Sequence, residues 1–155
     1  MFGGFASEQL AQRIAHSQPK VVLTATCGVE PTKIIPYKPL LDEAIRLSSW
    51  RPKSVIVYRR EQLRDVNFVE GRDFDWTSLL NRASPTECVP VLATDPLYML
   101  YTSGTTGTPK AILRDTGGYC VALTYSLTNA FNLKAGDTMF SASDVGWVVG
   151  HSYIV

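Results

Sequence analysis

Apolar and polar positions in the first half of the chain follow helical spacing and strand spacing in turn. Between Ser7 and Pro19, apolar residues recur at intervals of three and four residues, which predicts a helix. The run KVVLTAT (20–26) is continuous and rich in β-branched residues, as in a buried strand. A second helical face at 40–47 and a second strand, SVIVY (54–58), follow. Strand, helix and strand in this order predict a βαβ unit on a parallel sheet.

The second half of the chain begins with a polar stretch and then returns to shorter apolar runs. Residues 59–75 are polar and charged and predict a surface segment, and residues 75–83 predict a short helix. The further expected elements are strands at 96–102 and 110–114 joined by a loop rich in Gly and Thr, a helix at 118–130, a strand at 138–143, and a turn at 144–147 before a final apolar segment. The predicted fold class is α/β, with parallel or mixed sheets and flanking helices.

Composition narrows the range of partners. The chain has 155 residues, enough for about one domain, with 45% hydrophobic residues and a formal net charge of +1. A charge this small gives no reason to expect nucleic acid or an anionic membrane surface as a partner. No apolar run approaches the ~18 residues of a membrane-spanning helix. We therefore expect small-molecule partners, no nucleic acid and no membrane span.

The cysteines bear on the compartment of the protein. Cys27, Cys88 and Cys120 are far apart and form no CxxC or Cys/His spacing, so neither a disulfide framework nor a metal site is expected. Reduced thiols in the core of an intracellular protein, of the cytoplasm or the mitochondrial matrix, are the simplest interpretation. The chain enters a helical pattern almost at once and stops inside an apolar segment, which indicates an internal piece of a larger protein.

The stretch YTSGTTGTPK (101–110) is the strongest candidate for chemistry. Its glycines let the backbone turn its N–H groups toward an anion, and its hydroxyl groups and terminal lysine add donors and a positive charge. The ligand that uses all of these groups is a polyphosphate. The stretch is not a Walker A loop, because Lys110 follows Pro109 and is followed by Ala111 and a strand pattern. The alternative is a Thr-rich turn without a ligand.

This loop resembles the phosphate-loop signature of the AMP-forming adenylating enzymes, the superfamily of acyl-CoA synthetases, firefly luciferase and peptide-synthetase adenylation domains. RDTGGY (114–119) and DVGWVVGHSY (144–153) narrow the resemblance to short-chain acyl-CoA synthetases, and FGGFASEQLAQRI (2–14) and EGRDFDW (70–76) agree. The combination is most similar to the propionyl-/acetyl-CoA synthetase group. The resemblance implies that residues 1–155 form part of the N-terminal adenylating domain, without its first portion, its remainder or the C-terminal lid domain.

The resemblance also implies a reaction. Enzymes of this type join a carboxylic acid, here propionate or acetate, to ATP, release pyrophosphate, and transfer the acyl group from the acyl-adenylate to coenzyme A. ATP with Mg²⁺ and coenzyme A are then substrates of the parent enzyme, and no tightly bound cofactor is expected. Since a carboxylate is already ionised at neutral pH, the first step needs positioning and charge neutralisation rather than a general base. No catalytic side chain is expected in this segment, and the isolated fragment is expected to be inactive.

By resemblance, three sets of residues form the site. The ATP phosphates are assigned to Thr102, Ser103, Gly104, Thr105, Thr106, Gly107, Thr108 and Lys110. The acyl pocket is assigned to Trp147, Val148 and Val149, and coenzyme A to Glu30, Pro31, Thr32, Lys33 and again Val149. This chain departs from the family pattern at Thr108, where many members have a lysine, at Val149, where they have a threonine, and at Glu30 and Lys33, where they have two arginines. Core packing of 147–148 and a solvated loop at 30–33 are the alternatives.

Two other functions are compatible with the loop. One is a different adenylate-forming ligase of the superfamily, acting on an aryl, long-chain or amino acid, and DVGWVVGHSY argues against it. The other is a non-catalytic nucleotide-binding module that carries the same loop.

Overall fold

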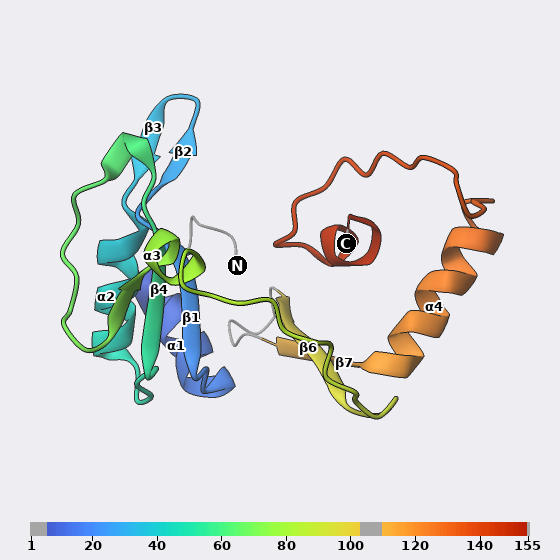
Figure 1. The fold of residues 1–155 in the computed structure, drawn as a ribbon, viewed down its shortest axis with the longest axis horizontal. Coiled ribbons are helices and arrows are strands. Elements are labelled where there is room, and N and C mark those ends of the chain that lie inside the picture. The colour runs from blue at the N-terminus through green and yellow to red at the C-terminus, as the bar shows by residue number, and fades with distance from the viewer. Residues whose placement is uncertain (1–5, 103–109, 155) are drawn as a thin grey trace. The chain divides into compact units, whose positions relative to one another are not determined.

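The computed structural model describes residues 6–102 and 110–154, which form two compact units (Figure 1). The N-terminal unit comprises residues 2–86 and the C-terminal unit residues 87–155. The greater part of the predicted phosphate loop, Ser103–Thr108, lies outside the described residues.

The N-terminal unit is built on a three-stranded parallel sheet. Its elements are α1 (Ser7–Ser17), β1 (Val21–Ala25), β2 (Gly28–Glu30), β3 (Lys33–Ile35), α2 (Tyr37–Leu47), β4 (Ser54–Tyr58), the 3₁₀ helix η1 (Glu61–Leu63), β5 (Asp73–Asp75) and α3 (Trp76–Leu80). The sheet order is β1-β4-β5, with Val21 opposite Ser54 and Val55 opposite Asp73, while β2 and β3 form a separate antiparallel hairpin. The βαβ unit predicted from β1, α2 and β4 is confirmed.

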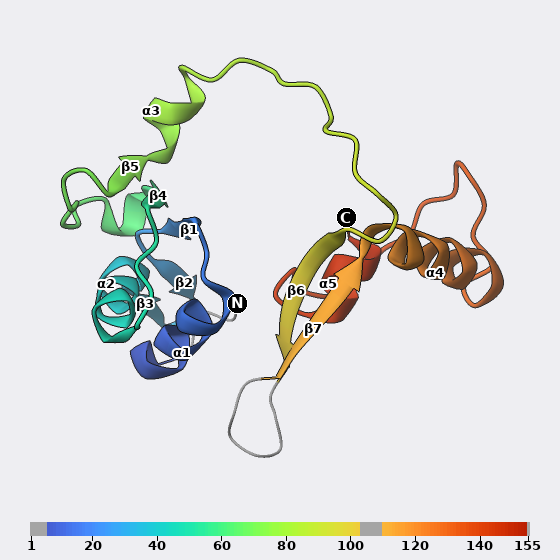
Figure 2. The same ribbon diagram turned by 90° about the horizontal axis from the view of Figure 1, so that it is seen from below.

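The core of this unit lies between the sheet and its two long helices. Helices α1 and α2 lie on the same face of the sheet (Figure 2). The buried apolar residues are Ala11, Ile14, Leu41, Ala44, Ile45, Val55 and Val57. The Ser7 hydroxyl group donates to the Leu40 carbonyl oxygen at 3.0 Å and so joins the start of α1 to α2. On the opposite face of the sheet, Leu23 is 62% exposed, so α1 and α2 leave this face of β1 uncovered.

Two features of the N-terminal unit differ from the predictions. The prediction of a surface segment through 59–75 is wrong at its end, because Asp73–Asp75 forms β5 and the Asp73 side chain is fully buried. A buried carboxylate needs compensating charges, and Lys38 and Arg72 supply them. The hairpin β2–β3 also forms in a segment for which no strand was predicted. The predicted helix at 75–83 is confirmed in the shorter form of α3, with the Asp75 carboxylate accepting from the Ser78 backbone N–H.

The C-terminal unit consists of a hairpin and two helices. Strands β6 (Pro96–Thr102) and β7 (Lys110–Asp115) pair antiparallel, with Met99 opposite Leu113 and Thr102 opposite Lys110. Helices α4 (Thr116–Asn129) and α5 (Val148–Tyr153) follow. The two strands and the helix α4 are confirmed, and the final apolar segment is the helix α5. The predicted strand at 138–143 is wrong: no described strand lies beside this segment to pair with its backbone groups, and it has no regular structure.

The predicted α/β class is therefore confirmed, with one parallel sheet and two antiparallel hairpins among the described residues rather than a mixed sheet. Of the cysteines, Cys27 is buried as expected, whereas Cys88 and Cys120 are exposed, so the expectation of three core thiols is wrong for these two. Within residues 6–102 and 110–154, no helix is both long enough and apolar enough to cross a membrane.

Candidate functional site

The predicted phosphate loop connects the paired ends of β6 and β7. Thr102 and Lys110 are opposite each other in the hairpin, and the Thr102 hydroxyl group donates to the Lys110 carbonyl oxygen at 3.4 Å. Both residues are exposed. The structure therefore confirms the two predicted strands on either side of the loop, the second of which begins at Lys110. The phosphate contacts themselves stay a prediction.

The residues assigned to the acyl pocket lie at the beginning of α5. Trp147 occupies the N-cap position, and Val148 and Val149 follow in the first turn. Their exposed fractions are 57%, 43% and 46%, so core packing within the C-terminal unit does not explain these large apolar side chains. A set of half-exposed apolar residues on one helical turn is instead compatible with contacts to a ligand or to another part of a larger protein.

Aromatic contacts fix α5 to the hairpin that carries the phosphate loop. The rings of Tyr98, on β6, and His151, on α5, stack with their centroids 4.9 Å apart. The Tyr119 ring meets Tyr98 edge to face at 5.2 Å, and the Tyr119 and Ser152 hydroxyl groups are 2.7 Å apart. Burial of its hydroxyl group raises the pKa of Tyr98 above the ordinary value. The first turn of α5, which is the candidate acyl wall, and the hairpin of the predicted phosphate loop are thus packed together within the C-terminal unit (Figure 2).

A close backbone approach at Gly150 explains a second feature of α5. The turn at 144–147 folds back against the helix, and the Trp147 backbone N–H donates to the Asp144 carbonyl oxygen at 3.0 Å. A Cβ atom added at Gly150 would lie 2.0 Å from that carbonyl oxygen and 2.7 Å from the Val145 Cα. Real side chains do not approach backbone this closely, so only glycine allows this arrangement. The glycine therefore sets the position of Val148 and Val149 relative to the turn.

The residues assigned to coenzyme A form the tip of the β2–β3 hairpin. Glu30 and Lys33 are opposite each other, and Lys33 Nζ lies 3.3 Å from Glu30 Oε2. Pro31 and Thr32 make the turn between them. Because Glu30 neutralises part of the Lys33 charge, the tip is a weaker anion site than one with two arginines. The exposed position of the tip also fits the alternative of a solvated loop.

Neither the aromatic contacts of Tyr98 nor the close backbone approach at Gly150 was predicted from the sequence. The contacts of Tyr98 with His151 join residues 53 positions apart in the sequence, and no local pattern predicts them. The glycine inside the apolar run GWVVGHSY was an available signal for close backbone approach. Among the described residues, no group of three or more His, Cys, Asp or Glu side chains is placed to hold a metal ion.

Comparison with known proteins defines the protein family of this chain. The whole chain, residues 1–155, matches the family described as AMP-binding enzyme. The chain therefore belongs to the AMP-binding enzyme family.

Individual relatives narrow the similarity further. The chain is 51% identical over 154 residues to the mouse acyl-CoA synthetase short-chain family member 3, mitochondrial, covering 99% of this chain and 23% of the mouse protein. It is 46% identical over 158 residues to the propionate–CoA ligase of Salmonella typhimurium, covering all of this chain and 25% of that protein. Among solved structures, acetoacetyl-CoA synthetase from Streptomyces lividans superposes with a TM-score of 0.75 at 28% identity, covering 96% of this chain and 23% of that one. The chain thus spans about a quarter of the length of these relatives.

Proposed function

We propose that the full-length protein containing this chain is an AMP-forming ligase that joins a short carboxylic acid, propionate or acetate, to coenzyme A. The observation that carries the proposal is the C-terminal unit, where the phosphate-loop hairpin and the half-exposed apolar turn of α5 are packed together through Tyr98 and His151. Family membership and the names of the short-chain relatives support the same reaction class.

In the first step, a carboxylate oxygen of the acid attacks the α-phosphorus of ATP, and pyrophosphate leaves. The protein's task is to hold the two reactants in line and to neutralise the charge that develops on the leaving group. We assign that task to the backbone N–H and hydroxyl groups of residues 102–108 and to the ammonium group of Lys110. Mg²⁺ would enter with the nucleotide. The isolated 155-residue chain is expected to have no ligase activity.

In the second step, the sulfur atom of coenzyme A attacks the acyl carbonyl carbon, the thiol proton is released, and AMP leaves. We assign the phosphate end of coenzyme A to the hairpin tip, where Lys33 offers the positive charge and Glu30 reduces it. Val149 would contribute to both steps, because the acyl group that we assign to the first turn of α5 is present both in the acid and in the acyl-adenylate.

The apolar turn of α5 is compatible with an acid that carries a short alkyl group. Trp147, Val148 and Val149 offer apolar surface to an alkyl group, and burying each CH₂ group contributes about 0.8 kcal/mol. Val149 makes this wall more apolar than the threonine of the family pattern, which is compatible with propionate as well as acetate. We place the full-length protein and its small-molecule substrates in the cytoplasm or the mitochondrial matrix.

Pyrophosphate exchange into ATP tests the first step in the full-length protein. Exchange that depends on acetate, propionate or butyrate is the expected result. The Lys110→Ala variant should reduce exchange by at least tenfold, while Lys134→Ala, an exposed lysine in the same unit, should leave it unchanged. Exchange supported only by aryl, long-chain or amino acids would favour another adenylate-forming ligase. No exchange with any acid would contradict the proposal and favour a non-catalytic nucleotide-binding module.

A further inference from the structure

A cluster of four charged side chains lies at the start of α2 in the N-terminal unit. The Lys38 side chain is 1% exposed, and its Nζ lies 2.8 Å from Asp73 Oδ2 and 2.6 Å from Asp42 Oδ2. Arg72 pairs with the same two carboxylates, and its Nε lies 2.6 Å from Asp73 Oδ1. Two cations and two carboxylates balance, so each buried charge has a partner of the opposite sign. We call Lys38, Asp42, Arg72 and Asp73 the charge cluster.

The Asp73 side chain is as fully enclosed as that of Lys38. Besides its two cationic partners, its Oδ2 accepts a hydrogen bond from the Val69 backbone N–H at 2.8 Å. Burial by itself raises the pKa of Asp73, but hydrogen bonds from Arg72 and Lys38 outweigh this effect and hold the pKa below its ordinary value. Asp73 is therefore ionised at neutral pH, and the charge cluster is a persistent contact between α2 and β5.

Lys38 also holds the root of the β2–β3 hairpin. Its backbone N–H donates to the carbonyl oxygen of Thr26 at 3.3 Å, two residues before β2 begins. The neighbouring Tyr37 ring packs against Gly28, where an added Cβ atom would lie 2.1 Å from the Tyr37 hydroxyl oxygen. Strand β3 runs into α2 through Pro36 alone. Both ends of the hairpin therefore depend on the position of the first turn of α2.

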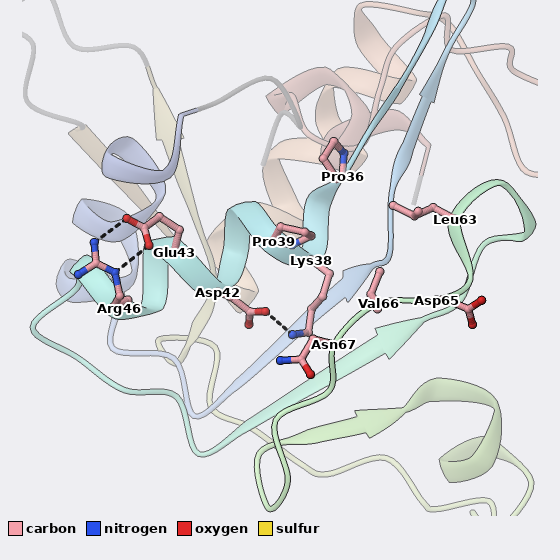
Figure 3. A pocket seen from close by; sticks show the side chains of 10 residues that line it. All are labelled: Pro36, Lys38, Pro39, Asp42, Glu43, Arg46, Leu63, Asp65, Val66 and Asn67. Carbon is pink, nitrogen blue, oxygen red and sulfur yellow. Dashed lines mark hydrogen bonds and ion pairs between the residues drawn. The ribbon is translucent and has the colours of Figure 1, made fainter.

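The first turn of α2 borders an open surface pocket on the side away from the core. Helix α2 begins after Pro36 without a hydrogen bond from a capping side chain. A surface pocket of about 620 Å³ lies next to its first turns, with Pro36 and Pro39 on one side and Leu63 on the other (Figure 3). Because this space is open, apolar packing contributes little there. The ion pair of Lys38 with Asp73 therefore ties the start of the helix directly to β5.

We propose that Lys38 is a positioning residue that, through the charge cluster, fixes the orientation in which the hairpin tip presents Lys33 to the phosphate end of coenzyme A. This inference rests on the proposed function. Lys38 joins the hairpin root through its backbone and the buried Asp73 through its side chain. Loss of its charge releases the hairpin while Lys33 itself stays unchanged.

The Lys38→Met variant of the full-length protein tests this role. Methionine keeps much of the apolar stem of lysine and removes only the charge. The KM for coenzyme A in thioester formation should rise at least tenfold, whereas acid-dependent pyrophosphate exchange, which needs no coenzyme A, should stay within twofold. Arg46→Met is the matched control, since Arg46 lies on the same helix in an exposed pair with Glu43 and should change neither quantity. An unchanged KM, or an equal loss in both assays, would overturn the inference.

A second variant decides the question if Lys38→Met does not fold. Gly28→Ala leaves every member of the charge cluster in place but puts a Cβ atom 2.1 Å from the Tyr37 hydroxyl oxygen, so the Tyr37 ring or the hairpin root has to shift. It should also raise the KM for coenzyme A and spare pyrophosphate exchange, and an unaltered KM would count against the inference. Failure of the proposed function appears differently, as absence of exchange in the unmodified protein. A Lys33→Ala variant with an unaltered KM for coenzyme A would overturn the role of the hairpin while leaving the adenylation step intact.

Discussion

Replacing Gly150 by alanine should displace Trp147, Val148 and Val149, the candidate acyl wall, although Gly150 itself is not one of these residues. The new Cβ atom would lie 2.0 Å from the Asp144 carbonyl oxygen, where ordinary contact needs about 3.4 Å, so α5 or the turn has to shift by more than 1 Å. The obstruction is backbone and cannot rotate away. Overpacking of this kind lowers the free energy of unfolding by about 1–3 kcal/mol. The higher helix propensity of alanine offsets up to about 1 kcal/mol of this loss. Displacing a substrate-positioning group by about 1 Å can reduce a rate about 10²-fold.

Acid-dependent pyrophosphate exchange in the full-length protein is the suitable assay. Gly150→Ala should lower kcat/KM for propionate about 10²-fold with the protein still folded, as judged by its thermal unfolding. Gly118→Ala is the matched control, because its added Cβ meets the Asp115 carboxylate, a side chain that can rotate away, at 2.7 Å. That control should stay within about threefold of the unmodified protein. A Gly150→Ala variant with unmodified kcat/KM would refute the assignment of α5 to the acyl wall.

Three further predictions concern single side chains. The folded-state pKa of Asp73 is lowered, so its stabilising effect is present above about pH 4 and is lost as the pH falls through the folded-state pKa. Asp73→Asn should therefore make the fall of the thermal unfolding temperature at acid pH less steep. A fall as steep as in the unmodified protein would contradict this prediction. Val149→Thr should lower the propionate-to-acetate ratio of kcat/KM by up to about tenfold, and a change in the KM for coenzyme A alone would place this residue on the thiol side. Lys33→Ala should raise the KM for coenzyme A but not for 3′-dephospho-coenzyme A, and equal effects on both would exclude a contact with the 3′-phosphate.

The parts of the fold that the sequence predicted are those governed by local pattern. The spacing of apolar residues in α1 and α2 and the β-branched run of β4 define their elements without reference to distant residues. Strand β5 was missed because Asp73 and Asp75 make it look polar. The burial of the Asp73 side chain depends on Lys38, which lies 35 positions earlier in the sequence. The reverse error occurred at 138–143, where a strand-like pattern finds no partner strand among the described residues.

In the candidate site, too, local features were predicted from the sequence and contacts between distant residues were not. The loop motif correctly predicted paired strands ending at Thr102 and beginning at Lys110, because a glycine-rich stretch between two apolar runs is a local signal. The aromatic positioning contacts are tertiary. The stacking of Tyr98 on His151 exists only once α5 is packed against the hairpin, whereas the contact of Gly150 with the Asp144 backbone is local and was signalled by the glycine itself. The residues that bring a site together are therefore harder to predict than those that would touch its ligand.

The most direct test of the central claim is an oxygen-18 transfer experiment on the full-length protein. Propionate labelled in both carboxylate oxygens is incubated with ATP, Mg²⁺ and coenzyme A, and the nucleotide product is analysed by mass spectrometry. If the carboxylate attacks the α-phosphorus and coenzyme A then attacks the acyl carbon, one labelled oxygen stays on phosphorus. The prediction is therefore AMP that carries one oxygen-18 atom, formed together with propionyl-CoA. Unlabelled AMP, or label found in pyrophosphate or inorganic phosphate, would contradict formation of an acyl-adenylate.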